Sequence, residues 1–218
     1  MNTPTFERVL TVLQKASARW NAPIVTLVAN RSRDPYQILI STLLSLRTKD
    51  EVTTEASRKL FEQASTPETM VGLSASSIRK LIYPAGFYKR KAETIRRVSR
   101  ILLDQYGGRV PDDLDELLRL PGVGRKTANL VVTLGFGKPG ICVDTHVHRI
   151  SNRLGYVATK TPEETEMALR EKLPALWWIP VNDILVTFGQ TLCKPISPWC
   201  SRCPVEKWCK KVNVGIRR

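Results

Sequence analysis

The sequence has no apolar run that could cross a membrane, because no window approaches the roughly eighteen apolar residues that a spanning helix needs. The first seven residues, Met-Asn-Thr-Pro-Thr-Phe-Glu, also lack the basic region and the apolar core of a secretion signal. We therefore expect a soluble, intracellular protein with no membrane partner. In a prokaryotic cell it would be cytoplasmic and located at the nucleoid.

The chain is also poor in acidic residues. Aspartate and glutamate number 20 against 34 lysines and arginines, which gives a formal net charge of +14. Such an excess favours a polyanionic partner, and nucleic acid is the leading candidate because its phosphates attract basic side chains. The basic residues gather in two groups, Lys89, Arg90, Lys91, Arg96, Arg97 and Arg100, and Lys207, Lys210, Lys211, Arg217 and Arg218. The first group is equally compatible with the solvated face of a helix.

Strand-like alternation of apolar residues is scarce, whereas helix signals occur along most of the chain, so the sequence predicts an all-α fold. Three capping residues followed by proline mark helix starts, namely Thr3-Pro4, Asp34-Pro35 and Thr161-Pro162. Glu164 completes a capping box with Thr161.

One helix is predicted from its period. Its apolar residues Ala92, Ile95, Val98, Leu102 and Tyr106 recur every three or four positions, and Gly107-Gly108 ends the segment. With 218 residues and 42% hydrophobic composition, the chain can bury a substantial core. We expect two lobes.

Five cysteines are present, and four of them close the chain as Cys193, Cys200, Cys203 and Cys209, separated by six, two and five residues. Four thiolates this close together can hold a single [4Fe-4S] cluster. A structural zinc site is the alternative, but zinc cysteines usually come as two tight pairs, and here only Cys200 and Cys203 are so close. The fifth, Cys142, lies in an apolar run and is interpreted as core packing.

A glycine-rich turn separates two predicted helices, one over 112–119 and another that runs to about Phe136. The turn belongs to the segment 120–129, Leu-Pro-Gly-Val-Gly-Arg-Lys-Thr-Ala-Asn. Gly122 and Gly124 would let the backbone approach a phosphate, beside Arg125. Contacts of this kind position DNA without reading its sequence. An ordinary turn between helices is the alternative.

Lys126 would lie in the first turn of the second helix, where it is a candidate amine nucleophile. A nucleophilic amine must be neutral, which costs about 4 to 5 kcal/mol at pH 7 from an ordinary lysine pKa. Asp144 is the candidate partner for the proton, although an aspartate before a threonine also fits a helix N-cap. The two histidines, His146 and His148, are interpreted as polar packing or phosphate contacts, not as metal ligands.

These segments together resemble the endonuclease III family of the helix-hairpin-helix DNA glycosylase superfamily. The resemblance runs from about residue 5 to residue 210 and rests on 120–129, on Val143-Asp144-Thr145-His146 and on the cysteine spacing. It implies a six-helix barrel lobe over 29–140 with the hairpin, and a second lobe from 1–28 and 141–218 that bears the cluster. A monomer would hold duplex DNA with damaged bases or abasic sites between the two lobes.

The resemblance also implies the chemistry. Lys126 would attack C1′ of a flipped, oxidised pyrimidine nucleotide with help from Asp144, form a Schiff base, and nick the strand by β-elimination, as a bifunctional DNA glycosylase and AP lyase of base excision repair. The residues expected to contact DNA are Gly122, Gly124, Arg125, Arg47, Phe87, Lys89 and His146.

Three positions depart from the family pattern. Arg47 replaces the glutamine that usually enters the gap left by the flipped base, which leaves the opposite-base preference open. Phe87 replaces a leucine wedge, and a flat ring could stack there; burial in the core is the alternative. The loop 194–199 is less basic than in many relatives.

Related branches remain alternatives. The adenine-removing branch has a catalytic glutamate where this chain has Thr42 and typically a serine at the position of Lys126, and the thymine-mismatch branch has a tyrosine there. Lysine disfavours both monofunctional branches. A non-catalytic iron–sulfur protein that binds DNA, or an electron carrier, would have no use for Lys126 and Asp144.

Overall fold

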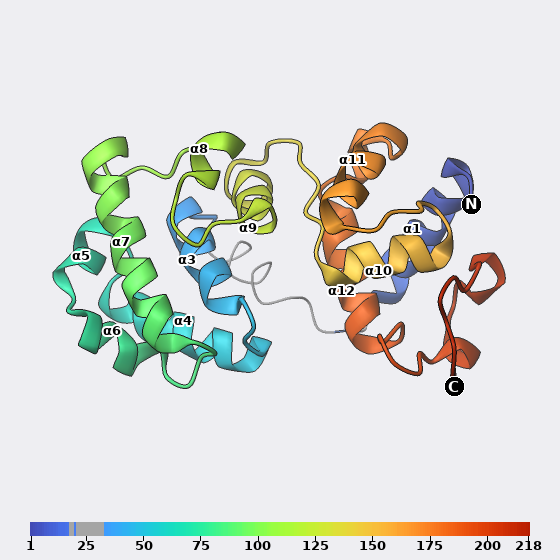
Figure 1. Cartoon of the computed structure of the whole chain (residues 1–218), viewed down its shortest axis with the longest axis horizontal. Coiled ribbons are helices and arrows are strands. Elements are labelled where there is room, and N and C mark those ends of the chain that lie inside the picture. Colours follow the sequence, from blue (N-terminus) through green and yellow to red (C-terminus); the bar gives the residue numbers. More distant parts are fainter. Residues whose placement is uncertain (18–19, 21–32) are drawn as a thin grey trace. The chain divides into compact units, whose positions relative to one another are not determined.

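The computed structural model describes residues 1–17, 20 and 33–218, and every regular element in these residues is a helix (Figure 1). The all-α prediction is therefore confirmed. The chain divides into two compact units, one made of Met1–Pro23 with Pro139–Arg218 and the other of Ile24–Lys138. The predicted lobe boundary at 28/29 lies outside the described residues. None of the described helices combines the length and the apolar character that crossing a bilayer requires.

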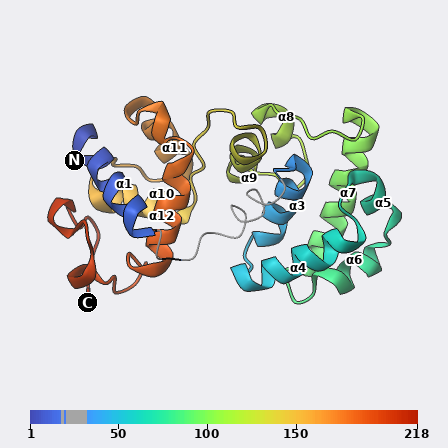
Figure 2. The same ribbon diagram turned by 180° about the vertical axis from the view of Figure 1, so that it is seen from behind.

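The contiguous unit, which we call unit 2, is built around α3. Its helices are α3 Pro35–Ser45, α4 Asp50–Gln63, α5 Pro67–Gly72, α6 Ala75–Ile82, α7 Tyr88–Tyr106, α8 Leu114–Leu118 and α9 Arg125–Leu130, followed by a π-helical turn, η1 Val131–Gly135. Eight of the eleven residues of α3 are buried. A helix that is buried on nearly all sides belongs at the centre of its unit. Accordingly, α3 contacts α4, α7 and α9 (Figure 2).

The start of α3 follows the prediction. Asp34 is its N-cap, with Oδ1 accepting a hydrogen bond from the amide of Tyr36 at 2.8 Å, and Pro35 occupies the first turn. The hydroxyl of Tyr36 is 2.6 Å from that of Ser99, which ties α3 to the buried face of α7.

The period of α7 is also confirmed. Ala92, Ile95, Val98 and Leu102 are all fully buried, and the helix ends at Gly107 in the left-handed conformation, with φ +57°. One member of the first basic group differs from its neighbours, because Lys91 is buried at 9% exposure.

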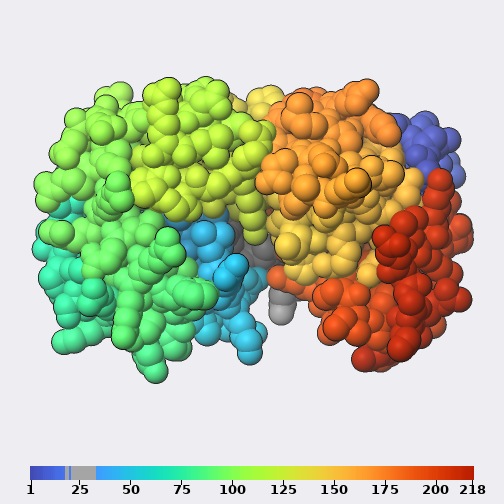
Figure 3. Space-filling model, in the orientation of Figure 1, coloured from blue at the N-terminus to red at the C-terminus, as the bar shows by residue number. Residues whose placement is uncertain are grey.

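The other unit, unit 1, joins the two ends of the chain. Its helices are α1 Thr3–Ser17, α10 Thr145–Leu154, α11 Pro162–Lys172 and α12 Pro180–Thr191, with 3-10 segments η2 Ala175–Trp177, η3 Cys200–Arg202 and η4 Glu206–Trp208. Both α1 and α10 pack on α12. Figure 3 shows the C-terminal residues lying against α10, where the amide of Val212 donates to the carbonyl of Arg153 at 3.0 Å.

Two details of the predicted caps are wrong. The residue that caps α1 is Asn2, whose Oδ1 accepts from the amide of Thr5 at 3.0 Å, while Thr3 is already helical. Thr161 does cap α11, accepting from the amide of Glu164 at 3.1 Å. The Glu164 carboxylate, however, accepts from the amide of Lys160 at 2.7 Å, one residue before the capping-box position.

Candidate functional site

The glycine turn lies between α8 and α9, as the sequence indicates. The helix before it is shorter than the predicted 112–119, because Asp113 caps α8 by accepting from the amides of Asp115 at 2.9 Å and Glu116 at 3.1 Å. After the turn, Gly124 is the N-cap of α9. Val123, between the two glycines, is buried at 7% exposure and anchors the turn in unit 2.

The two glycines of the turn differ in whether the folded structure requires a glycine at that position. Gly122 has φ +78°, and a Cβ there would lie 2.9 Å from Cγ2 of Thr94, so the fold itself favours glycine. Gly124 has φ −100° and ψ 175°, which any residue adopts, and a Cβ there would meet nothing within 4 Å. Folding therefore does not require glycine at 124. Its missing side chain instead leaves the exposed backbone open to a molecule outside the protein.

Arg125 and Lys126 are the first two residues of α9, and both are half-buried. The residues that follow them, Thr127 to Leu130, are all buried, and Nδ2 of Asn129 donates to the carbonyl of Arg125 at 3.1 Å. The Lys126 side chain therefore projects from a firmly packed helix start.

Asp144 belongs to unit 1, where it is the N-cap of α10. Its Oδ1 accepts from the amides of His146 at 2.8 Å and Val147 at 2.9 Å. The capping role is thus observed. The structure places Lys126 and Asp144 at two helix starts, one in each unit.

Both histidines are half-buried in unit 1. Nδ1 of His146 lies 3.1 Å from Nη2 of Arg149, and Nδ1 of His148 lies 2.7 Å from the hydroxyl of Thr165. Both therefore take part in polar packing.

Arg47, Phe87 and Lys89 are exposed in unit 2. Arg47 lies in the loop after α3 with φ +52°, and Phe87 precedes α7 with φ +57°. The Arg47 guanidinium lies over the Phe87 ring, 5.7 Å from its centroid. Because the Phe87 side chain is 62% exposed, the core interpretation of this residue is wrong.

The sequence analysis assigned no role to two residues in or behind this surface, the exposed Tyr83 and the buried Lys91. Tyr83 is 62% exposed in the same loop as Phe87 and packs edge to face on Tyr88, with ring centroids 5.3 Å apart. The aromatic content of the segment 83–88 was the available signal. Lys91 carried no such signal, because it is one of several consecutive basic residues.

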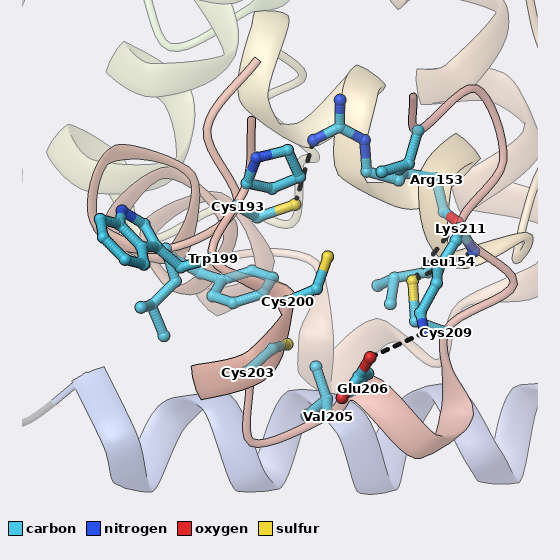
Figure 4. Close-up of a pocket in the computed structure, with 14 residues that line it drawn as sticks. Arg153, Leu154, Cys193, Trp199, Cys200, Cys203, Val205, Glu206, Cys209 and Lys211 are labelled. Carbon is cyan, nitrogen blue, oxygen red and sulfur yellow. Dashed lines mark hydrogen bonds and ion pairs between the residues drawn. The ribbon is translucent and has the colours of Figure 1, made fainter. Parts of the chain in front are cut away.

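The four C-terminal cysteines are free thiols that line one pocket of unit 1. Cys193 follows α12, Cys200 begins η3, Cys203 follows η3, and Cys209 follows η4. Figure 4 shows their sulfur atoms turned toward the same space. Each is half-buried, and apolar residues such as Phe188 complete the lining.

The surroundings of these thiols affect their ionisation. Burial, with a smaller contribution from the neighbouring thiols, raises the pKa of Cys203 to about 11 and also raises the pKa of Cys209. A thiolate ligand at this place therefore needs a bound cation and hydrogen-bond donors. Donors of this kind are present: Nη1 of Arg153 is 3.4 Å from Sγ of Cys193, and the amide of Lys211 is 3.3 Å from Sγ of Cys209. A backbone hydrogen bond from Val205 to Cys203 also acts to lower the pKa of that thiol.

Among the described residues, no three histidine, cysteine, aspartate or glutamate side chains are placed to hold a single metal ion. Cys142 lies outside the pocket and is buried at 2% exposure, as the core interpretation predicts.

Residues 40–175 match the HhH-GPD superfamily of base excision DNA repair proteins. The chain belongs to this superfamily, and its relatives place it in the endonuclease III family. It is 54% identical to endonuclease III of Thermotoga maritima over 83% of this chain and 85% of that protein. It is also 41% identical to endonuclease III homolog 2, chloroplastic, of Arabidopsis thaliana. That match covers 94% of this chain and 57% of the longer Arabidopsis protein.

A solved structure has the same fold. The trapped endonuclease III–DNA covalent intermediate, an estranged-adenine complex, superposes with a TM-score of 0.86 at 33% identity and covers 97% of both chains. The fold and the family that the sequence resembles are therefore both confirmed.

Proposed function

We propose that the chain is a bifunctional DNA glycosylase and AP lyase of base excision repair that removes oxidised pyrimidines from duplex DNA. Membership of the endonuclease III family gives the enzyme class. The observation that carries the bifunctional mechanism is the lysine at position 126, in the first turn of α9 and directly after the glycine turn. Lysine is the residue type that forms a Schiff base with a sugar carbon.

In this mechanism Nζ of Lys126 attacks C1′ of the flipped nucleotide, and the bond from C1′ to the base breaks. The base leaves with a proton, and the C1′–O4′ bond then breaks, which opens the sugar ring and gives an imine between Nζ and C1′. The imine makes the C2′ proton acidic, so that loss of this proton breaks the bond from C3′ to the phosphate oxygen and nicks the strand. Asp144 accepts a proton from the lysine. Its N-cap hydrogen bonds both use Oδ1, which fixes the orientation of the carboxylate.

The glycine turn is proposed to bind the DNA backbone. Gly124 supports this, because its exposed backbone carries no side chain although the fold would accept one. Arg125 and Lys89 add positive charge, and His146 lies at the start of α10. Arg47 and Phe87 are proposed to enter the base stack, since both are exposed and share one face of unit 2.

Cys193, Cys200, Cys203 and Cys209 are proposed to hold a [4Fe-4S] cluster. The donor set fits this group, because four soft ligands line one pocket and the sulfurs of Cys193, Cys203 and Cys209 accept hydrogen bonds. When bound, the cluster would supply the cations that keep the buried thiols deprotonated. It would thereby tie residues 193–209 into a single structural segment.

The test is borohydride trapping on a duplex that contains one oxidised pyrimidine. Borohydride reduces the imine and leaves the wild-type protein covalently joined to DNA. Lys126→Gln should keep binding to the damaged duplex while losing base release, nicking and the adduct. Base release by the wild type without any adduct would instead indicate a monofunctional glycosylase, and this proposal would then be wrong.

A further inference from the structure

Lys91 is a buried lysine without a carboxylate among its hydrogen-bond partners. Its Nζ donates to the carbonyl of Leu44 at 2.6 Å, to the carbonyl of Leu46 at 2.7 Å and to the hydroxyl of Thr48 at 2.7 Å. An ammonium group has three donors, so all of them are used. Burying a charge for packing alone is unfavourable, which points to a role for these three contacts.

All three acceptors belong to one short segment, the end of α3 and the loop 46–49 that carries Arg47. The last carbonyls of a helix have no partner within the helix. Here the amide of Thr48 donates to the carbonyl of Ser45 at 3.1 Å. Lys91 donates to the carbonyls of the residues before and after Ser45, Leu44 and Leu46. A cation at a helix C-terminus is also favoured by the helix dipole. Lys91 thus fixes the course of the chain where it leaves α3.

The same lysine is connected to a second loop, 83–87, which carries Phe87. The hydroxyl of Thr48 accepts from Lys91 and also from the amide of Gly86, at 3.1 Å. The two loops also touch directly, since a Cβ on Gly86 would clash with the carbonyl oxygen of Arg47. Lys91 follows Phe87 by four residues in the first turn of α7, so its helix and its hydrogen bonds join both loops.

Arg47 and Phe87 each sit next to this junction in the left-handed conformation, which residues with side chains rarely adopt. Such a conformation persists where the surroundings fix it. The two exposed side chains lie against one another, with the guanidinium over the ring. Their shared orientation therefore depends on the contacts behind them.

We infer that Lys91 is a positioning residue that holds the Arg47 and Phe87 loops together as one rigid unit for insertion into the base stack. This inference rests on the proposed function, because insertion presupposes a flipped nucleotide. Lys91 itself does not touch DNA. Its effect reaches the DNA through the two loops, and it should matter most where a paired base must be displaced.

The protonation state of Lys91 is compatible with this role. Burial lowers the pKa of Lys91 to about 8. The side chain therefore remains mostly protonated at pH 7 and keeps its three donors. Its partners are two backbone carbonyls and a hydroxyl, none of which titrates near this pH.

Two substitutions remove the contacts in different ways. Lys91→Met keeps most of the stem and removes the donors, and Thr48→Val keeps the shape of the threonine and removes the bridging hydroxyl. Lys59→Met is the matched control, because Lys59 has the same charge, lies in the same unit and makes only an exposed ion pair with Glu55 at 3.3 Å. Melting temperatures establish that each variant is folded before it is compared.

The first measurement compares two substrates under single-turnover conditions. On a duplex with one oxidised pyrimidine, Lys91→Met and Thr48→Val should slow base release by about tenfold or more. On a single strand with an abasic site, where no paired base is displaced, borohydride trapping should stay within about twofold of wild type. Unchanged rates on the duplex would overturn the inference, as would an equal loss on both substrates.

The second measurement needs no DNA. An Arg-specific protease should cleave after Arg47 several times faster in Lys91→Met than in wild type or in Lys59→Met, because the loop has lost its anchor. Equal cleavage rates would also overturn the inference. If the wild type formed no borohydride adduct, the proposed lyase function would fail on its own, and protease cleavage would still decide whether Lys91 holds the loop.

Discussion

Nη1 of Arg153 donates a hydrogen bond to Sγ of Cys193 at 3.4 Å. The same guanidinium binds the carbonyls of Lys194 at 2.8 Å and Pro195 at 3.1 Å. Arg153 lies in the last turn of α10, the helix that Asp144 caps at its other end. The ten-residue helix α10 therefore has the proposed catalytic aspartate as its N-cap and, in its last turn, the arginine that anchors the proposed cluster segment.

Iron content tests the cysteine pocket. Protein purified without oxygen should contain about four iron and four sulfide per chain. Cys200→Ala should lose iron and destabilise unit 1, since ligand binding and folding are coupled. Cys142→Ser, outside the pocket, is the control and should keep its iron. One zinc per chain without labile sulfide would contradict the cluster.

Asp144 can be tested by separating its two roles. Asn caps a helix about as well as Asp, so Asp144→Asn should keep the melting temperature near that of wild type while slowing base release about 10²-fold or more. Asp144→Ala should lose both activity and about 1 kcal/mol of stability. If Asp144→Asn were fully active, Asp144 would be a cap without a catalytic role.

Gly124→Val should weaken binding to damaged and undamaged duplexes alike, because a side chain would block the approach of phosphate to the backbone. The melting temperature should fall only slightly, since a Cβ at this position meets nothing within 4 Å and the replacement of glycine by valine at an N-cap costs about 1 kcal/mol or less. Gly72→Val, at another position open to solvent, is the matched control for the added side chain. A change in lesion preference at constant affinity would contradict the phosphate contact.

The stability contribution of Lys91 should depend on pH. Burial lowers its pKa to about 8, so the folded protein loses this proton before the unfolded chain, where an ordinary lysine has a pKa near 10.4. The cost of burying the charge is present in full below pH 8 and is relieved as the pH rises above it. Between pH 7 and 9.5 the stability of wild type should therefore rise by about 1 to 2 kcal/mol relative to Lys91→Met.

Denaturant unfolding of wild type and Lys91→Met over this pH range measures the difference between their free energies of unfolding. The titration of all other groups cancels in this difference. A difference that does not change with pH would mean that the pKa of Lys91 is not lowered in the folded protein.

Features with a local cause could be predicted from the sequence. The α7 helix was predictable because its apolar period and the Gly107 that ends it lie in one continuous segment. The N-caps at Asp34 and Asp144 were predictable because each aspartate directly precedes the helix that it caps. The cap of α1 was missed because Asn2 and Thr3 are both good capping residues. Thr3 has a distant alternative partner, the hydroxyl of Tyr156 at 3.3 Å.

Features that depend on distant partners could not be predicted. Lys91 follows two basic residues that are exposed, and only its acceptors, more than forty positions earlier, explain why it is buried. The exposure of Phe87 also depends on the fold, because a phenylalanine is more often buried. The difference between Gly122 and Gly124 emerges only once the neighbours of each Cβ position are known.

The division of unit 1 between the two ends of the chain affects how the protein can form during synthesis. Unit 2 is one continuous stretch, so it can fold while the ribosome is still producing the rest. The apolar face of α1, with Phe6, Leu10 and Leu13, packs on α12, which is made more than 160 residues later. The packing of this first helix therefore cannot be completed until nearly the whole chain has left the ribosome.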